Sequence, residues 1–363
     1  MKKTLVALAV AAVAATSANA AVVYDQDGSK VEVGGSVRLL LQKETDKRTD
    51  LKNSGSRITV NASQDLGSGL SAIGQLEVRP DFDSSVKTAR LWAGFKQDGI
   101  GRLTFGKQLT TGDEVGVSDY TYNLGGINKV TDSGDKVVHF RSDTFGGFGF
   151  GADYLFGSSA KATDLKDKDG NILATKNTKN NNGYVVGAFY NNKFGDLGVK
   201  FDIGYSLDNR AVAPTVTAEA KSYKEKGFTT GLELSYDKFS IGVDYAQRKT
   251  NSDAYGVTYR VVKKDDGKAT QTQFGKIREI ELGVKYQYLE NASVYGEYIW
   301  GKATKDVDGD EDVKLNAWIL GADYKIHKNV VTYLEGGSFK YKGVESKNKT
   351  TDNKIGVGLR VFF

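Results

Sequence analysis

Side chains that could act as nucleophiles, bases or metal ligands are few in this sequence and far apart. The 363 residues include two histidines, His139 and His327, and no cysteine. A nucleophilic site needs its nucleophile within hydrogen-bonding reach of a base, and transition-metal sites draw on imidazole or thiolate ligands. The sequence therefore shows no catalytic constellation. We expect a protein that is not an enzyme and that holds no metal and no cofactor.

An acidic stretch near residue 310 has the spacing of a possible calcium loop. Four aspartates alternate there: Asp306, Asp308, Asp310 and Asp312. An EF-hand loop needs glycine at its sixth position and glutamate at its twelfth. Counted from Asp306, the glycine is fourth, at Gly309, and the twelfth residue is Ala317. We interpret the stretch as a solvated loop, with weak divalent-ion binding as the alternative.

Two further binding functions are also disfavoured. Gly147, Gly149 and Gly151 alternate within a predicted strand and open no helix, so they cannot form the phosphate-binding turn of a nucleotide site. They fit a lumen lining or a close subunit contact. Of the 50 basic residues, 48 remain after Lys2 and Lys3 are set aside, against 45 acidic ones. This near balance, without a concentrated basic face, argues against nucleic acid as a partner.

The first residues predict export. Lys2 and Lys3 precede an apolar run from Leu5 to Ala15, which is followed by the small-residue site Ala18–Ala20. This order is typical of a secretory signal peptide, and the run is shorter than the roughly 20 residues of a membrane-spanning helix. We predict a signal peptide at residues 1–20, removed after export, and a single domain at 21–363.

The rest of the chain alternates apolar and polar residues with a period of two. In the first such segment, about 30–42, Val37 and Leu41 share one face while Arg38 shares the other with Ser36 and Gln42. Sixteen segments behave in this way, joined by alternating short turns and long polar loops. The long ones include 43–55, 108–135, 158–181 and 249–276. This pattern is typical of strands that cross a membrane with lipid on one side and water on the other.

Composition and the last strand favour a closed barrel. The chain has 43 Gly, 17 Phe and 19 Tyr but 2 Pro, and many of the aromatic residues lie near the predicted strand ends, as in interfacial girdles. Ordinary β-propensity is the alternative explanation of the aromatic content. The final strand places Ile355, Leu359 and Phe363 on one face. Closing it onto the first strand would remove both sheet edges, which hydrocarbon does not tolerate. The predicted fold is an all-β, antiparallel transmembrane barrel.

At this level of detail the chain resembles the general diffusion porins of the Gram-negative outer membrane, and among them the OmpH-like porins of the Pasteurellaceae. The resemblance covers the whole chain. It rests on Ala21 to Leu41, on Arg90 to Gln108 with its continuation through Thr121, and on the tail from Lys354 to Phe363. It implies a 16-stranded barrel that assembles as a homotrimer, with the third outer loop folded inward to narrow the pore.

The resemblance also implies location and partners. The protein is expected in the cell outer membrane, in contact with lipid and lipopolysaccharide, where it would let small hydrophilic solutes and ions diffuse passively. The barrel-assembly machinery would recognise the last strand through Gly358, Val361 and Phe363.

Strand register predicts which charges line such a pore. Alternation places Arg38, Arg57, Arg90 and Arg141 in the lumen, on the first, second, fourth and sixth strands. The resemblance implies arginines at the positions of Arg57, Arg90 and Arg141. Many relatives have a basic residue at the position of Ser36, so Arg38 either replaces that residue or lies beside it. The alternative is that all four are ordinary lumen charges.

The long segment 108–135 is the candidate constriction loop, and its acids are Asp113, Glu114 and Asp119. By resemblance, Asp119 matches an acid that faces the arginines. Another acidic position of the family is Asn123 here, so we expect a weaker acidic side. Arginines on the wall and carboxylates on the loop would create a transverse field across a narrow aqueous slot.

Two other functions are alternatives to a channel. Barrel enzymes carry acids with His, or Ser with His, on outer loops, whereas His327 falls in a predicted periplasmic turn and His139 at an inward strand position. Barrels used for adhesion or anchoring usually have fewer strands and a plugged interior. Electrical conductance in a lipid bilayer would distinguish these alternatives from a porin.

Overall fold

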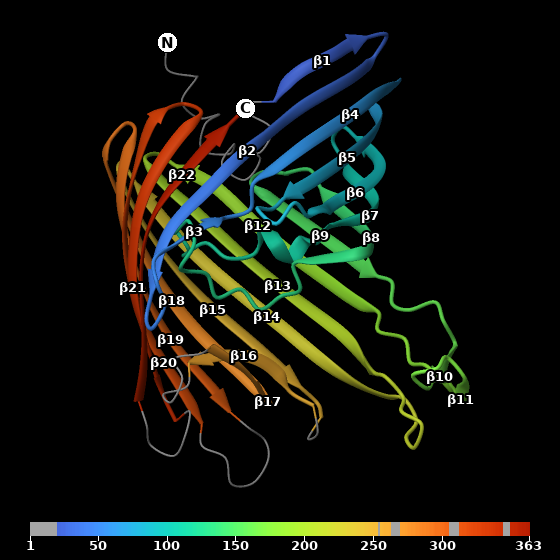
Figure 1. The fold of residues 1–363 in the computed structure, drawn as a ribbon. Coiled ribbons are helices and arrows are strands. Elements are labelled where there is room, and N and C mark those ends of the chain that lie inside the picture. The colour runs from blue at the N-terminus through green and yellow to red at the C-terminus, as the bar shows by residue number, and fades with distance from the viewer. Residues whose placement is uncertain (1–19, 253–254, 263–268, 305–311, 344–348) are drawn as a thin grey trace.

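The computed structural model describes residues 20–252, 255–262, 269–304, 312–343 and 349–363. Sixteen antiparallel strands close into one barrel (Figure 1). These strands are β2 (Ser29–Glu44), β4 (Arg57–Gly67), β5 (Leu70–Pro80), β6 (Val86–Gln97), β7 (Gly101–Leu109), β8 (Ser133–Ser142), β9 (Phe148–Leu155), β12 (Gly183–Phe194), β13 (Leu197–Val212), β14 (Lys221–Tyr236), β15 (Phe239–Thr250), β18 (Lys276–Leu289), β19 (Ala292–Thr304), β20 (Val313–His327), β21 (Val330–Lys342) and β22 (Lys349–Phe362). The all-β barrel predicted from the alternation is confirmed.

The barrel closes between its first and last strands. β2 pairs with β22 from Ser36 opposite Phe362 to Glu44 opposite Lys354. The backbone N–H of Gly35 donates to the carbonyl of Phe363 at 2.8 Å, which extends the seam to the last residue. No sheet edge is therefore left between these strands in the membrane, where unpaired backbone groups are costly.

Burial is inverted relative to a water-soluble protein. Large apolar side chains such as Leu91, Phe150 and Leu320 are exposed, with more than half of their surface accessible. Their polar neighbours point to the other face, where Glu281 and Asp244 are buried. Apolar side chains outside and polar ones inside are what a lipid-embedded barrel with a hydrated interior requires.

The connections are short at one end of the barrel and long at the other, as the sequence predicts. At the short end, β4–β5 turns through Ser68 and Gly69, both of which have positive φ (54° and 76°). Two successive residues with positive φ form the type I′ turn that matches the twist of paired strands. Tight turns at this end hold the register of the neighbouring strands.

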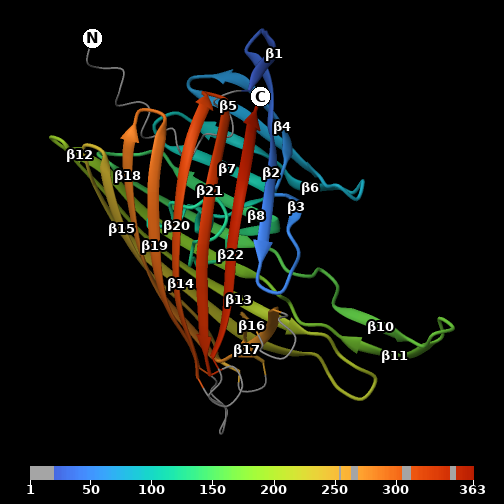
Figure 2. The same cartoon turned by 60° about the vertical axis from the view of Figure 1, so that its left-hand side comes forward.

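Several short elements lie outside the sixteen strands. β1 (Ala21–Gln26) pairs with the start of β2, and β3 (Asp50–Asn53) pairs with its end. Two hairpins, β10 (Ala162–Lys166) with β11 (Ile172–Asn177) and β16 (Val257–Val262) with β17 (Ala269–Phe274), occupy segments that the sequence indicated only as polar loops (Figure 2). Their alternating runs are too short to separate from loop sequence.

Two sequence predictions concern residues that lie wholly or partly outside the described ranges. Residues 1–19 of the predicted signal peptide lie outside them, so its removal stays a prediction. Asp306, Asp308 and Asp310 also lie outside them, whereas Asp312 is described and pairs with Lys302 at 2.6 Å. Among the described residues, no helix is long and apolar enough to cross a membrane.

Candidate functional site: segment 110–132 and the inner charges

Segment 110–132 connects β7 to β8 and begins with a short 3₁₀ helix, η1 (Thr111–Glu114). The side chain of Thr110 caps this helix by accepting a hydrogen bond from the N–H of Gly112 at 3.1 Å. The Thr110 hydroxyl also donates to the carbonyl of Thr131 at 2.5 Å, which joins the two ends of the segment. The segment therefore leaves and re-enters the wall at a closed base.

Six inward-facing acids accept hydrogen bonds from backbone N–H groups of the segment, and together they form what we call the carboxylate clasp. They come from six strands: Asp153 on β9, Asp202 on β13, Asp244 on β15, Glu281 on β18, Glu297 on β19 and Glu335 on β21. All six are buried, with at most 5% of their surface exposed. Each acid accepts at least one backbone hydrogen bond, so the clasp holds the segment along much of its length.

Asp244 and Glu335 make the most contacts within the clasp. Asp244 accepts from the N–H groups of Val117 and Ser118 at 2.9 Å, and from the Ser118 hydroxyl at 2.7 Å. Glu335 accepts from the N–H of Asn123 at 3.1 Å and from the N–H of Tyr122. These two carboxylates therefore hold residues 117–118 and residues 122–123 of the segment, respectively.

His139 supports the first carboxylate of the clasp. Its Nδ1 lies 2.6 Å from Asp153 Oδ1, while Asp153 Oδ2 accepts from the N–H of Thr111 at 2.8 Å. Both side chains are buried. The inward position predicted for His139 is confirmed, and its contact orients an acid that holds η1.

Inner-face glycines give the segment room to lie against the wall. A side-chain methyl at Gly151 or Gly187 would overlap Thr111, and one at Gly242 or Gly283 would overlap the backbone at Val117 or Ser118. Three of these glycines lie two residues from a clasp acid, in the pairs Gly151 with Asp153, Gly242 with Asp244 and Gly283 with Glu281. On the same strand face, the glycine makes space and the acid supplies the acceptor.

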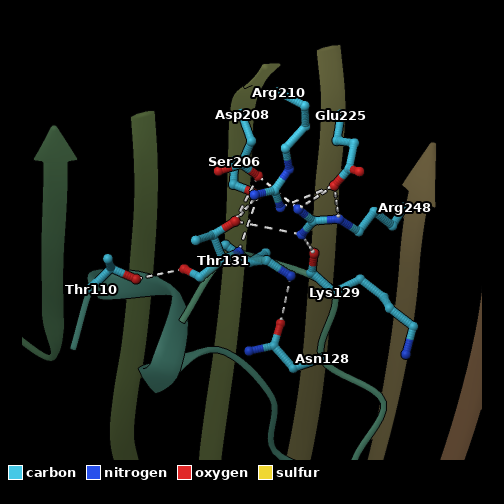
Figure 3. Close-up of polar contacts among 10 residues, drawn as sticks. Thr110, Asn128, Lys129, Thr131, Ser206, Asp208, Arg210, Glu225 and Arg248 are labelled. Atoms are coloured by element: carbon cyan, nitrogen blue, oxygen red, sulfur yellow. Dashed lines mark hydrogen bonds and ion pairs between the residues drawn. The ribbon is translucent and has the colours of Figure 1, made fainter. Parts of the chain in front are cut away.

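The returning limb of the segment is held by an arginine (Figure 3). Arg248 on β15 donates to the carbonyl of Lys129 at 3.0 Å and binds Asp208 and Glu225, each at 2.8 Å. Asp208 also accepts from the hydroxyl of Thr131 at 2.7 Å. Arg210 also pairs with Glu225, at 3.1 Å, so two arginines balance two carboxylates in this group, which indicates an anchor for the backbone.

Three of the four predicted wall arginines belong to one charged group. Arg38 interacts electrostatically with Arg57 and with two cations absent from the predicted set, Arg79 and Arg360. Arg90 interacts with Arg79 and with Glu77. Register explains the grouping, because Arg38 is directly opposite Arg360 and Glu77 is opposite Arg90.

Glu77 provides the carboxylate among these five arginines. Its Oε1 lies 2.7 Å from Arg79 Nε, and its Oε2 lies 3.7 Å from Arg57 Nη1. Glu77 is buried, whereas the arginine side chains retain some contact with solvent. The group therefore carries an excess of positive charge toward the interior. Glu77, Arg79 and Arg360 are not among the site residues predicted from the sequence.

Arg141 makes a different set of contacts. Its Nε lies 2.9 Å from Glu114 Oε2, and its guanidinium lies over the ring of Phe189 at 4.4 Å. Arg102 reaches the same carboxylate at 4.0 Å. Arg141 thus pairs with a predicted loop acid, which attaches η1 to β8.

The other predicted loop acids and Asn123 lie at different points of the segment. Asp113 is exposed and interacts electrostatically with Asp132 and Arg90. Asp119 is also exposed, and it interacts with the clasp acids Glu281 and Glu297. Asn123, next to Tyr122, donates through its side chain to the Tyr333 hydroxyl at 2.5 Å.

Arg360 and the ring of Tyr333 hold the segment at Tyr122. Tyr122 stacks on Tyr333 with ring centroids 4.3 Å apart. Arg360 lies over the Tyr122 ring at 4.7 Å and donates to its carbonyl at 2.8 Å. Gly358, on the same strand as Arg360, faces Tyr333, where a methyl group would overlap the ring.

The predicted assembly signal lies in the barrel seam. Val361 pairs with Val37, and the N–H of Phe363 donates to the Gly35 carbonyl at 3.1 Å. Gly358 pairs with Leu40. Their recognition by assembly machinery stays a prediction.

The amino-acid sequence is similar to those of known proteins. Residues 7–344 match the sequence family described as Gram-negative porin. The chain is 45% identical over 386 residues to the major outer membrane protein of Pasteurella multocida strain Pm70, with both chains fully covered. A second Pasteurella multocida major outer membrane protein is 41% identical over 391 residues, again with full coverage of both chains.

Solved structures with the same fold share little sequence with this chain. Salmonella typhi OmpF, in complex with daunomycin, aligns with a TM-score of 0.67 and 15% identity over 94% of this chain and 99% of its own. The anion-selective porin of Comamonas acidovorans gives a TM-score of 0.65 and 17% identity, over 92% and 100%. These likenesses show the fold alone.

Proposed function

The chain belongs to the Gram-negative porin family and forms an outer-membrane channel for passive diffusion of small hydrophilic solutes, and from this premise we propose how it selects them. Segment 110–132 folds into the barrel and narrows the aqueous path. Solutes pass between this segment and the wall that carries Arg38, Arg57 and Arg90. Selection is by size and by charge at that point.

The carboxylate clasp is the observation that carries this proposal. A loop that starts at β7 and ends at β8 donates hydrogen bonds to inner-face acids on β13, β15, β18, β19 and β21. These strands extend around the barrel away from β7 and β8. Backbone groups can reach acids on so many strands only if the loop runs along the interior.

The charges on the two sides of this path support a transverse field. The arginine group is neutralised in part by Glu77, while Asp113 and Asp119 expose carboxylates on the loop. A narrow, low-dielectric passage strengthens the field of such charges relative to bulk water. Polar solutes that can align with the field would cross more easily than apolar solutes of equal size.

Asp113 makes the selectivity of the channel depend on pH. Protein around the carboxyl removes part of its hydration, and Asp132 repels its charge, so the pKa of Asp113 is raised to about 6. Below that pH the group becomes neutral and the loop loses one negative charge. We expect the reversal potential in a potassium chloride gradient to shift toward anion preference between pH 7 and pH 5.

A variant and a stability measurement check this assignment. D113N should resemble the wild type at pH 5 and should lose the titration step near pH 6. Because the pKa of Asp113 is higher in the folded protein than in the unfolded chain, the folded protein binds this proton more tightly. Protonation of Asp113 therefore adds to the free energy of unfolding at low pH, and this stabilisation is lost as pH rises through about 6. A wild-type reversal potential that is flat across this range would contradict the role of Asp113.

Absence of stepwise conductance in the bilayer would contradict the channel itself.

Assembly and partners follow from the family as further proposals. We propose a homotrimer, and one of the similar structures, OmpT of Vibrio cholerae, is described in a trimer form. Lipopolysaccharide and lipid would surround it, and the barrel-assembly machinery would insert it through the strand that ends at Phe363. We propose no enzymatic activity, which the family and the names of the relatives support. Mobility of the unheated protein on a gel would report the trimer.

A further inference from the structure

The inner wall of the barrel becomes apolar toward the ends of β18 to β21 near the long loops. Midway along β20 the pattern is that of a pore, with Leu320 exposed outside and Asp323 buried inside. Toward its loop end the pattern reverses, because Lys314 and Asn316 are exposed on the outer face while Leu315 and Ala317 are buried on the inner face.

The same reversal occurs on the neighbouring strand. On β21, Lys340 and Lys342 are exposed outside, and Phe339 and Tyr341 are buried inside. Charged residues on the outer face indicate that these ends extend beyond the hydrocarbon layer. Apolar residues on the inner face would there meet water, unless another part of the chain covers them.

The β16–β17 hairpin supplies that cover. Val257, Tyr259 and Phe274 have at most 8% of their surface exposed and belong to one cluster with the apolar inner wall. That wall consists of Ala246, Ile277, Ile299, Ala303, Val313, Leu315, Ala317, Ile319, Phe339 and Tyr341. The alternate residue of β16, Thr258, is exposed. In Figures 1 and 2 the hairpin lies at the end of the barrel where the long loops gather.

The hairpin is joined to segment 110–132 through one wall carboxylate. The Tyr259 hydroxyl donates to Glu279 Oε1 at 2.7 Å, and Glu279 Oε2 forms an ion pair with Lys129. Gly301 on β19 leaves space for this tyrosine, because an added methyl would lie 3.0 Å from the hydroxyl. Ile127 and Leu124 of the segment also pack with the cluster.

We propose that the β16–β17 hairpin is a second pore-narrowing element, packed inside the outer end of the barrel, where it braces segment 110–132. It blocks the side of the entrance next to β18–β21 and leaves the passage on the side of the arginine wall. The solute path is then restricted twice, first by the hairpin and then by the segment. This goes beyond the proposed function, which requires only segment 110–132.

Single cysteines test the position of the hairpin, because the natural chain has none. In the assembled protein, V257C and F274C should react with a bulky, water-soluble maleimide at least about tenfold more slowly than T258C, since reaction requires an exposed thiol. Urea-unfolded protein should label equally at all three positions. Equal fast labelling of V257C, F274C and T258C in the folded protein would overturn the proposal.

Solute flux tests the narrowing. V257A/F274A should loosen the hairpin and raise the rate of liposome swelling by a trisaccharide severalfold more than that by a pentose, while T258A should change neither. Unchanged trisaccharide entry in a normally assembled V257A/F274A protein would overturn the narrowing role. The maleimide result reports burial of the hairpin whether or not segment 110–132 narrows the pore, so it separates failure of this inference from failure of the proposed constriction.

Discussion

The double variant D244A/E335A is expected to conduct more current per channel than the wild type and to admit larger solutes. Asp244 accepts three hydrogen bonds from Val117 and Ser118, and Glu335 accepts two from Tyr122 and Asn123. A hydrogen bond to a charged group contributes about 1.5–3 kcal/mol. Loss of these five bonds should loosen the segment between residues 117 and 123, which Glu297 and Arg360 still hold through Tyr120 and Tyr122 together with the Asn123–Tyr333 contact.

The measurement is single-channel conductance together with liposome swelling by sugars of increasing size. We expect increased current noise as well, because a loosened segment would move within the channel. The matched control is D196A/E290A, which removes one exposed acid from the β12–β13 turn and one from the β18–β19 turn. Its effect should be small. Wild-type conductance and size limit in D244A/E335A would show that the clasp does not set the pore width.

The double variant R57Q/R90Q is expected to shift ion preference toward cations and to raise conductance for large solutes. Both side chains belong to the arginine group, where Glu77 is the neutralising carboxylate. At about 10 Å in water-like surroundings each charge contributes about 0.4 kcal/mol to the energy of a passing ion. Two such charges change the permeability of a monovalent cation and that of an anion by up to about fourfold each, in opposite directions, and so change their ratio by up to about sixteenfold before screening.

The reversal potential should be measured at about 0.1 M salt, because the Debye length is then about 10 Å and the wall charges are not fully screened. The control R278Q/K328Q removes the same number of positive charges from exposed positions, one on the outer face of β18 and one in the β20–β21 turn. An equal shift in control and variant would indicate a general charge effect. Unchanged selectivity in R57Q/R90Q alone would remove these arginines from the selecting site.

Much of the barrel could be predicted from the sequence because period-two alternation is a local signal. In β2, Val37 and Leu41 point outward and Arg38 points inward, as the pattern indicates. The short turns could also be predicted, because glycine and small polar residues mark them locally in the sequence. The apolar inner wall at the ends of β20 and β21 was not predicted, because alternation alone does not tell which face is wet once a strand leaves the membrane.

The candidate site was predicted only in part. Strand register predicts that the arginines point inward. Their grouping depends on which strands are neighbours across the barrel seam, which the sequence pattern does not tell. As a result, Arg141 pairs with Glu114 and lies apart from Arg38, Arg57 and Arg90. The clasp was missed, although its sequence signal was present. A glycine two residues from an inward acid recurs on β9, β13, β15 and β18, for example at Gly242 and Asp244. That spacing marks a wall against which another backbone can lie.

The most direct test of the central claim, that segment 110–132 lies in the path of the solutes, is thiol modification of D119C during a bilayer recording. Asp119 is exposed on the segment, and the natural chain contains no cysteine. A cationic methanethiosulfonate should lower the single-channel current of D119C in steps and move its selectivity toward anions, while the wild type should not respond. Complete modification of D119C, verified by mass, with no change in current or selectivity would contradict the claim.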